Sequence, residues 1–402
     1  MENVVIPYPE SQEEKDNSTF QEVEQILPSG EEFFDMLEQE LREIARITII
    51  RTIEDEFNQF IGAAHYQRAE ERTDYRNGVR YRRNFDTRFG PIEDIPIPRS
   101  RNEGFIPRLF SRWTRREKKI TRLIADIFIN GVSTRKVKNI TKTILGRSYS
   151  ASSVSRSNKV LQEEYLSWIN RPIKKSIRYL FLDAINLKVR RHWISKESLL
   201  CAIGITDDGK KEFLGFLLGG RESTKSWENI LLLLLQRGLS PEHLKLVIVD
   251  GNAGLLSAVD TLLPDVPLQR CIVHKLRNII ARTPHRLRGI VPAEAKQIFY
   301  ATSESEARQL FTAFKQRWQQ QLPSVVECIE KDLDQLLAFY RFPYQHWVKI
   351  RSTNVIERAF KEFRRRIKVM ETFPNELSCL RIMFSLAKML NENWSYKPIK
   401  DF

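Results

Sequence analysis

The segment between residues 175 and 275 changes repeatedly between strand-like and helix-like patterns, and it constrains the fold more than any other part of the chain. It begins with three apolar stretches typical of a strand meander, two of them joined by a turn at Asp208-Gly209. A helix, a strand, a second helix and a further strand follow. A meander that continues as alternating helices and strands predicts one mixed α/β sheet covered by helices.

Two of the predicted strands end in an aspartate. The run "RYLFLD" ends at Asp183, and "KLVIVD" ends at Asp250. In an open α/β sheet, the carboxyl ends of the strands border the crevice in which ligands bind. One such aspartate is weak evidence, because aspartate also begins turns and Asp250 is followed by a glycine. Two of them predict a shared acidic site.

A third acidic candidate, Glu357, lies in a basic helix, "STNVIERAFKEFRRRIKVM". Apolar residues recur there at helical spacing, so one stripe of this helix should face the core. Glu357 falls on the adjacent flank together with Lys361, Arg364 and Lys368. Two structural alternatives stay open: an ion pair with Lys361, or a capping box in which Asn354 is the N-cap.

The functional interpretation of Glu357 joins it to the two aspartates. Three convergent carboxylates can hold two Mg²⁺ ions, with Mn²⁺ as a substitute, and such a pair serves both sides of a phosphoryl displacement. The cations on the same flank, together with Arg365 of the same helix, would then bind the phosphodiester backbone.

Composition identifies the class of partner. The 402-residue chain has a net charge of +14, although residues 1–40 hold 12 acidic residues and one lysine. Residues 101–150 hold 13 basic and three acidic residues. A basic body of this size indicates double-stranded DNA as the partner, rather than a membrane or a small-molecule substrate. No signal-peptide pattern or membrane-length apolar run is present, so we expect a cytoplasmic, nucleoid-associated protein.

The N-terminal half carries the expected DNA-binding elements. A helix from residue 31 to about 64 precedes a basic β-ribbon, with a turn at Asn77-Gly78 and an end at Pro96 and Pro98. Three further helices, the first closed by Gly131, fit a helix-turn-helix, with a plain three-helix bundle as the alternative. Candidate DNA contacts in this half are Arg76, Arg135, Lys136, Ser153 and Arg156.

Four stretches resemble, in order, the motifs of the mutator-type transposases of bacterial insertion sequences: "FLDAINLKVR", "LVIVDGNAGLLSAV", "LQRCIVHKLRNI" and "STNVIERAFKEFRRR". The resemblance runs from about residue 35 to 395. It implies an RNase H-like catalytic core whose Asp-Asp-Glu triad is Asp183, Asp250 and Glu357. The C-x-x-H motif of that family falls on Cys271 and His274. No second pair lies nearby to complete a zinc site, so we expect them to shape the site, with a packed core histidine as the alternative.

The resemblance and the local patterns together predict a multidomain fold, an α/β RNase H-like core with an all-α insertion, preceded by helical and helix-turn-helix DNA-binding domains. The expected parts are an acidic disordered tail (1–30), a helical and β-ribbon DNA-binding region (31–105), a helix-turn-helix domain (106–170), the first part of the core (175–283), the helical insertion (284–350) and the closing helix (351–396).

The resulting functional hypothesis is a DNA transposase that binds terminal repeats as a homodimer, nicks DNA and transfers strands with Mg²⁺. Two alternatives are a nuclease or junction resolvase on the same core, and a catalytically inert DNA-binding repressor. Trp227, Trp318 and Trp347 are candidates for stacking on an unpaired base, although aromatic residues at helical positions usually belong to the core.

Overall fold

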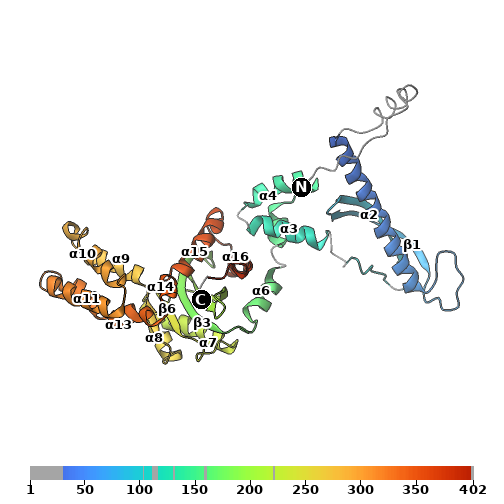
Figure 1. Ribbon diagram of the computed structural model, residues 1–402. Helices are drawn as coiled ribbons and strands as arrows, with labels where there is room; N and C mark the ends of the chain where they lie inside the picture. Colours follow the sequence, from blue (N-terminus) through green and yellow to red (C-terminus); the bar gives the residue numbers. More distant parts are fainter. Residues whose placement is uncertain are drawn as a thin grey trace, which may run out of the picture. The chain divides into compact units, whose positions relative to one another are not determined.

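The computed structural model describes residues 30–102, 104–110, 116–129, 132–157, 161–220 and 222–399 (Figure 1). Residues 1–29 of the expected acidic tail and Gly131 lie outside this description. Contacts divide the chain into two compact units, Met1–Ile124 with Lys138–Tyr149, and Ala125–Val137 with Ser150–Phe402. This division passes through the range expected for the helix-turn-helix domain, and the domain boundaries stay predictions. Among the described helices, none is long and apolar enough to cross a membrane.

The first unit is built on one long helix and a β-ribbon. Helix α2 (Gly30–Ile61) begins and ends close to the expected positions, and it packs its C-terminal half against the antiparallel strands β1 (Arg76–Thr87) and β2 (Gly90–Ser100). The core residues of this unit come from all three elements and include Ile53, Phe57, Phe85, Ile92 and Ile95.

The ribbon itself is confirmed, but two expectations about its ends are wrong. Its turn joins Thr87 to Gly90, whereas Asn77-Gly78 lies at an irregularity of register within β1. Gly78 has a φ of +76°, which suits a bulge as well as a turn. Pro96 and Pro98 lie inside β2 rather than ending it, as a two-stranded ribbon allows because each strand has an open edge.

The three helices expected after the ribbon are present: α3 (Lys118–Ile129), α4 (Thr134–Leu145) and α5 (Ala151–Ser157). The hydroxyl of Ser150 accepts a hydrogen bond from the Ser153 amide at 3.2 Å, as expected for the start of α5. Their use as a helix-turn-helix on DNA stays a prediction.

The second unit contains the predicted mixed sheet, with the strand order β5-β4-β3-β6-β7. Strands β3 (Ile177–Arg190), β4 (Ile194–Thr206) and β5 (Lys211–Gly219) form the antiparallel meander, and its turn at Asp208-Gly209 is confirmed. Strands β6 (Leu246–Val249) and β7 (Leu268–Arg270) continue the sheet in parallel with β3.

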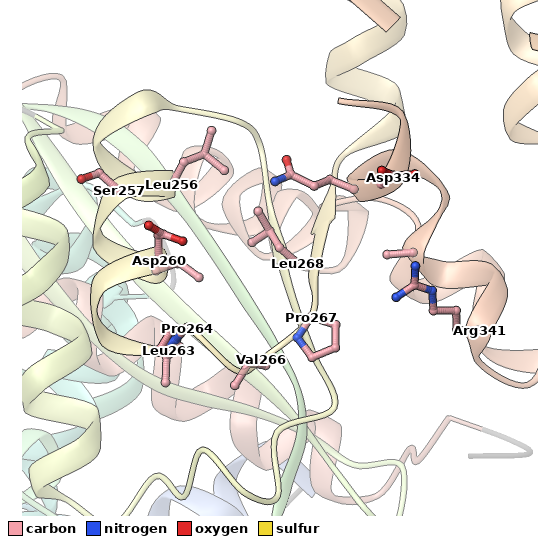
Figure 2. Close-up of a pocket in the computed structure, with 13 residues that line it drawn as sticks. Leu256, Ser257, Asp260, Leu263, Pro264, Val266, Pro267, Leu268, Asp334 and Arg341 are labelled. Atoms are coloured by element: carbon pink, nitrogen blue, oxygen red, sulfur yellow. The ribbon is translucent and has the colours of Figure 1, made fainter. Parts of the chain in front are cut away.

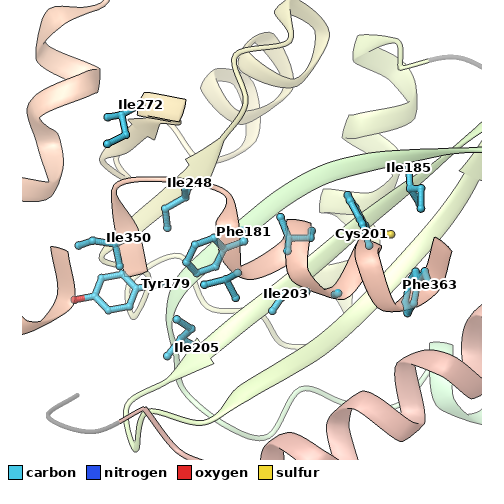
Figure 3. Close-up of a cluster of buried hydrophobic side chains, with 14 of the residues drawn as sticks. Tyr179, Phe181, Ile185, Cys201, Ile203, Ile205, Ile248, Ile272, Ile350 and Phe363 are labelled. Atoms are coloured by element: carbon cyan, nitrogen blue, oxygen red, sulfur yellow. The ribbon is translucent and has the colours of Figure 1, made fainter. Parts of the chain in front are cut away.

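Helices cover both faces of this sheet. Helices α7 (Thr224–Gln236) and α8 (Ala253–Leu262) pack on the side chains of Leu180 and Leu182, whereas α6 (Leu161–Ile169), α15 (Asn354–Ile367) and α16 (Glu376–Ser395) pack on the opposite face. Figure 3 shows the core on that opposite face, where Phe181 and Ile185 of β3 lie with Phe363 of α15. Because side chains alternate along a strand, consecutive residues of β3 serve different layers.

The all-helical segment expected before Glu357 is also present, and it contains α9 (Ile272–Arg282), α10 (Val291–Phe299), α11 (Glu304–Trp318), α12 (Pro323–Glu330), α13 (Leu333–Leu337), the 3-10 turn η3 (Ala338–Arg341) and α14 (Tyr344–Ile350). Gln269 on β7 joins it to the sheet. Its buried amide donates to the Leu336 carbonyl at 3.0 Å and accepts from the Phe339 amide at 2.8 Å.

The three tryptophans considered for base stacking are buried or half-buried, and two of them donate hydrogen bonds through the indole nitrogen. Trp227 is 1% exposed and Trp318 is 5% exposed, so neither presents a ring face to solvent. The indole nitrogen of Trp318 donates to Glu294 at 2.7 Å, and that of the half-buried Trp347 donates to the Phe342 carbonyl at 2.7 Å. The stacking hypothesis is therefore not supported for these residues.

Candidate active site

Asp183 and Asp250 lie side by side on neighbouring parallel strands. The pairing of β3 with β6 ends at Leu182 and Val249, and the two aspartates are the next residues on their strands. Adjacent strands lie about 4.8 Å apart. Asp250 follows its strand as predicted, but Asp183 does not end β3, which continues beside β4 as far as Arg190. Asp183 instead marks the end of the pairing with β6.

Both aspartates belong to the sheet face that α15 covers. Phe181 and Ile185, two residues to either side of Asp183, belong to the core on that face, as does Ile248, two residues before Asp250. Helix α15 carries Glu357 and packs against β3. The structure therefore brings the three predicted carboxylates to one side of the sheet.

The environment of Asp183 disfavours a negative charge. The residue is 9% exposed, and this burial, followed by the like charge of Asp250, raises its pKa to about 7. The amide of Ala184, which donates to the Asp183 carboxylate at 2.7 Å, acts in the opposite direction. Within the described chain, neither aspartate has a lysine or arginine at ion-pair distance. Asp183 and the half-buried Asp250 thus form an acidic pair with no lysine or arginine partner among the described residues, although the charge of His274 acts to lower the pKa of Asp183.

The turn after Asp250 needs glycine and is fixed by Asn252. Gly251 has a φ of +98°, and a Cβ atom there would lie 2.3 Å from a guanidinium nitrogen of Arg270. The Asn252 amide donates to Asp250 at 3.0 Å, and its side chain donates to Glu222 at 3.1 Å while capping α8. The sequence analysis did not identify Asn252, although an asparagine directly before a helix is a recognisable N-cap signal.

Glu357 takes part in neither of the two structural alternatives. The N-cap of α15 is Thr353, so Asn354 is already helical and does not start a capping box. Among the described residues, no ion pair joins Glu357 to the lysine one turn later. Its Oε1 atom instead lies 3.8 Å from His274 Nε2 and 3.8 Å from Arg277 Nη1, both on α9. Arg277 was not predicted, although it lies one turn after His274.

Cys271 connects the start of α9 to the start of α15. Its Sγ atom accepts hydrogen bonds from both the amide and the hydroxyl of Thr353, each at 3.3 Å. Burial opposes ionisation, but the hydrogen bonds from His274 and Thr353 together lower the pKa of Cys271. The thiol in turn raises the pKa of His274 against the effect of burial. Cys271 thus contacts the residue that begins α15, and His274 lies 3.8 Å from Glu357, but a role of the two residues in shaping the site stays a prediction.

In the part of the chain that the structure describes, no three histidine, cysteine, aspartate or glutamate side chains converge closely enough to hold a metal ion. Glu357 is directed toward α9, whereas Asp183 and Asp250 adjoin each other. The donor atoms are nevertheless carboxylate oxygens, the ligands preferred by Mg²⁺ and Mn²⁺. Metal binding by the triad stays a prediction.

The candidate DNA-contact residues differ in how freely they can reach a ligand. Lys361, Arg364, Arg365 and Lys368 are exposed on or just after α15, and so are Arg135, Lys136 and Arg156 on α4 and α5. Arg156 donates to the Ser153 hydroxyl at 3.1 Å.

Arg76 is the exception, because its guanidinium group is held within the first unit. It lies 2.5 Å from Glu54 and 2.5 Å from Asn58, and it stacks 5.0 Å from the ring centre of Phe57. These contacts favour a structural role for Arg76 over contact with DNA.

A separate cavity of about 580 Å³ has α8 and β7 on one side and α13 and η3 on the other (Figure 2). Apolar side chains such as Leu263 and Leu268 line it, together with Asp260, Asp334 and Arg341. None of the three candidate catalytic carboxylates lines this cavity.

Comparison with known proteins places the chain in a family. Residues 18–397 match the family described as Transposase, Mutator family. The chain is 36% identical over 355 residues to the transposase for insertion sequence element ISRM5 of Rhizobium meliloti, an alignment that covers 88% of each protein. It is 33% identical over 379 residues to the transposase for insertion sequence element IS256 in transposon Tn4001 of Staphylococcus aureus, covering 92% of this chain and 96% of the relative. The chain therefore belongs to the Mutator family of transposases.

Proposed function

We propose that this transposase nicks DNA at the ends of its element and joins the freed 3′-hydroxyl to a second phosphodiester, using Asp183, Asp250 and Glu357 as an Asp-Asp-Glu triad. The observation that carries this proposal is the pairing of two carboxylates, without a lysine or arginine partner among the described residues, on the face covered by a basic helix that carries a third. The strand order, a meander followed by two parallel strands, supports an RNase H-like core.

The triad would hold two Mg²⁺ ions, for which Mn²⁺ can substitute. Its members supply only oxygen donors, and a bound cation would favour the ionised form of Asp183, whose pKa is raised by burial and by the charge of Asp250. Bound divalent ions supply charge stabilisation for in-line displacement at phosphorus. To join the aspartates, Glu357 would have to turn from His274 and Arg277, each 3.8 Å away, and release the hydrogen bond that the Thr353 hydroxyl donates to it at 3.4 Å.

In the reaction itself, an oxygen of water attacks the phosphorus atom, and the 3′-oxygen leaves and takes up a proton. The new 3′-hydroxyl then attacks another phosphodiester, loses its proton and displaces a second 3′-oxygen. The exposed cations beside Glu357 hold the phosphodiester backbone during both steps. Cys271 and Thr353 fix the start of the helix that carries them.

DNA recognition is assigned to the N-terminal elements. Arg135, Lys136 and Arg156 are exposed on α4 and α5, where they can contact the phosphate backbone or base edges as parts of a helix-turn-helix. A homodimer would supply one acidic site for each end of the element, in keeping with the two-fold symmetry of most protein–DNA assemblies on inverted sites.

Incubating the full-length protein with labelled terminal DNA and Mg²⁺ tests the proposal. Joined product supports transposition, cut product alone indicates a nuclease, and bound but intact DNA indicates an inert repressor. Glu357→Gln keeps the size of the side chain and removes its charge. It should leave the melting temperature within a few degrees and DNA binding intact, while cleavage and joining fall by orders of magnitude. Full activity in this variant would remove Glu357 from the triad.

A further inference from the structure

A second cavity, of about 320 Å³, lies within the second unit where α16 begins. Its wall combines residues from α3, from the residue before α4 and from both sides of the N-terminus of α16. None of the proposed catalytic carboxylates lines it, and none of the candidate DNA contacts does. Its volume is at the lower end of the range for small-ligand sites, roughly 300–1,000 Å³.

The unusual residue in this cavity is Arg381. It is 7% exposed, and no carboxylate of the described chain lies at ion-pair distance from it. Its Nε atom donates to the Leu377 carbonyl at 3.2 Å, but no described acceptor reaches its two terminal nitrogens. Neither terminal nitrogen is completely buried, because Arg381 has no nitrogen that is both fully buried and without a partner. The charged end of Arg381 is therefore open to the cavity.

Two other arginines of this unit, the half-buried Arg171 and the buried Arg237, have more hydrogen-bond partners, although Nη2 of Arg237 has none among the described residues. Arg171 pairs with Glu212 at 3.1 Å, and Arg237 donates to the carbonyls of Arg171 and Leu214 at 2.7 and 2.8 Å. A buried cation without a counter-charge is costly, and burial alone lowers the pKa of Arg381. An anion in the cavity would supply the missing partner.

The rest of the wall indicates what kind of anion fits. Hydroxyl groups of Ser133, Thr372 and Ser378 line the cavity, and Ser378 lies in the first turn of α16, whose N-terminal end favours negative charge. Phe128 and Phe373 supply aromatic surface on the same cavity. A phosphate attached to a flat apolar group matches both kinds of wall, whereas free inorganic phosphate would leave the aromatic part unused.

We propose that this cavity binds one nucleotide of the DNA substrate, with its phosphate on Arg381 and its base against Phe128, the more exposed of the two aromatic side chains. The nucleotide must be unpaired, because a cavity of about 320 Å³ is too small for a base pair. This inference rests on the proposed function for the identity of the ligand, but not for the existence of an anion site.

The first test uses the unaltered full-length protein. Thymidine 5′-monophosphate, thymidine and inorganic phosphate are titrated separately by calorimetry in metal-free buffer at constant ionic strength. The monophosphate should bind at least about tenfold more tightly than either of the others, because only it uses both walls. Equal binding of inorganic phosphate, or no binding of the monophosphate, would overturn the nucleotide site.

A matched pair of variants then assigns the site. Arg381→Gln should weaken binding of the monophosphate by about 10- to 100-fold, the value of hydrogen bonds to a charged group. Arg317→Gln removes the same charge from an exposed arginine that is 61% accessible and pairs with Glu294, and it should leave binding unchanged. Equal affinities in the two variants would overturn the role of Arg381.

Photo-crosslinking separates DNA from a free nucleotide as the source. Terminal DNA with 5-iododeoxyuridine at successive positions is irradiated with the unaltered protein, and crosslinked peptides are identified by mass spectrometry. Crosslinks at Phe128 or Phe373 that thymidine 5′-monophosphate suppresses would support the proposal, even if Arg381→Gln fails to fold. Crosslinks only outside the cavity would overturn it, leaving the transposase assignment intact. Failure of DNA joining alone would overturn the proposed function instead.

Discussion

Replacing Asp183 by asparagine should make the metal-free protein more stable at neutral pH while removing its activity. Asp183 is 9% exposed beside Asp250, no lysine or arginine of the described chain lies at ion-pair distance from the pair, and the charge of His274 offsets the rise in pKa only in part. Asparagine has nearly the same shape, and its carbonyl oxygen can keep the hydrogen bond from the Ala184 amide, which is 2.7 Å long in the structure. The substitution therefore removes mainly the unfavourable charge.

The size of the effect follows from the pKa. Burial first and the charge of Asp250 second raise the pKa of Asp183 from 3.8 to about 7. The folded state thus holds this proton over a pH range in which the unfolded state has lost it, so the free energy of unfolding falls as pH rises from about 4 to 7. The full difference, reached above pH 7, corresponds to about 4 kcal/mol. The asparagine side chain does not titrate, so this loss should be absent from the Asp183→Asn protein.

The assay is urea unfolding, followed by circular dichroism, at pH 4, 6 and 8 with EDTA. The Asp183→Asn protein should exceed the unaltered protein by about 2–4 kcal/mol at pH 8 and by less than about 1 kcal/mol at pH 4. Millimolar Mg²⁺ should stabilise the unaltered protein at pH 8 and so reduce the difference in free energy of unfolding between it and the Asp183→Asn protein. Asp265→Asn, at an exposed aspartate of the same unit, is the control and should show no such pH dependence. A variant that is less stable at every pH would refute the like-charge argument.

Three further substitutions test separate parts of the structure. In Cys271→Ser, a smaller oxygen atom replaces the sulfur that accepts hydrogen bonds from Thr353 at 3.3 Å. Strand transfer should then slow about tenfold or more, with little change in melting temperature. An unchanged rate would mean that the thiol serves only in packing. Gly251→Ala should lower the free energy of unfolding in urea by about 1–3 kcal/mol, because φ is +98° there and a Cβ atom would meet Arg270. The loss should exceed that of Gly146→Ala, where φ is +64° and a Cβ atom would have no neighbour within 4 Å. Arg156→Ala should weaken binding of terminal DNA by about 1–3 kcal/mol if it reads a base edge, and a loss equal on unrelated DNA would assign it to phosphate.

Features encoded by short-range patterns were predictable from the sequence. The Asp208-Gly209 turn, the short strand before Asp250 and the apolar stripe of α15 each follow from residues within about ten positions of one another. These elements are found where periodicity and turn chemistry predict them. The two aspartates on one sheet face also follow, because strand alternation fixes the direction of side chains.

Features that depend on pairing between distant segments were not predictable. The run "RYLFLD" gives no sign that β3 continues past Asp183, because that extension is stabilised by β4. The ribbon turns at Thr87 and Gly90 rather than at Asn77-Gly78, since the register is decided by which apolar side chains reach α2. Arg76 was predicted to contact DNA, but in the structure its guanidinium group contacts Glu54 and Asn58, which are far from it in the sequence.

The position of Glu357 relative to the aspartates depends most on such distant contacts. Asp250 and the start of α9 are separated by one helix and one short strand, whereas the whole helical insertion intervenes before Glu357. Gln269, which precedes the insertion, bonds to Leu336 and Phe339 in its later part, and Cys271 accepts bonds from Thr353, which follows the insertion. The two anchoring residues, Gln269 on β7 and Cys271 at the N-cap of α9, are two positions apart. Strand β7 pairs with β6, which Asp250 directly follows. A change within the insertion can therefore leave the site intact as long as these two anchors hold, whereas loss of either would move Glu357 without touching a carboxylate.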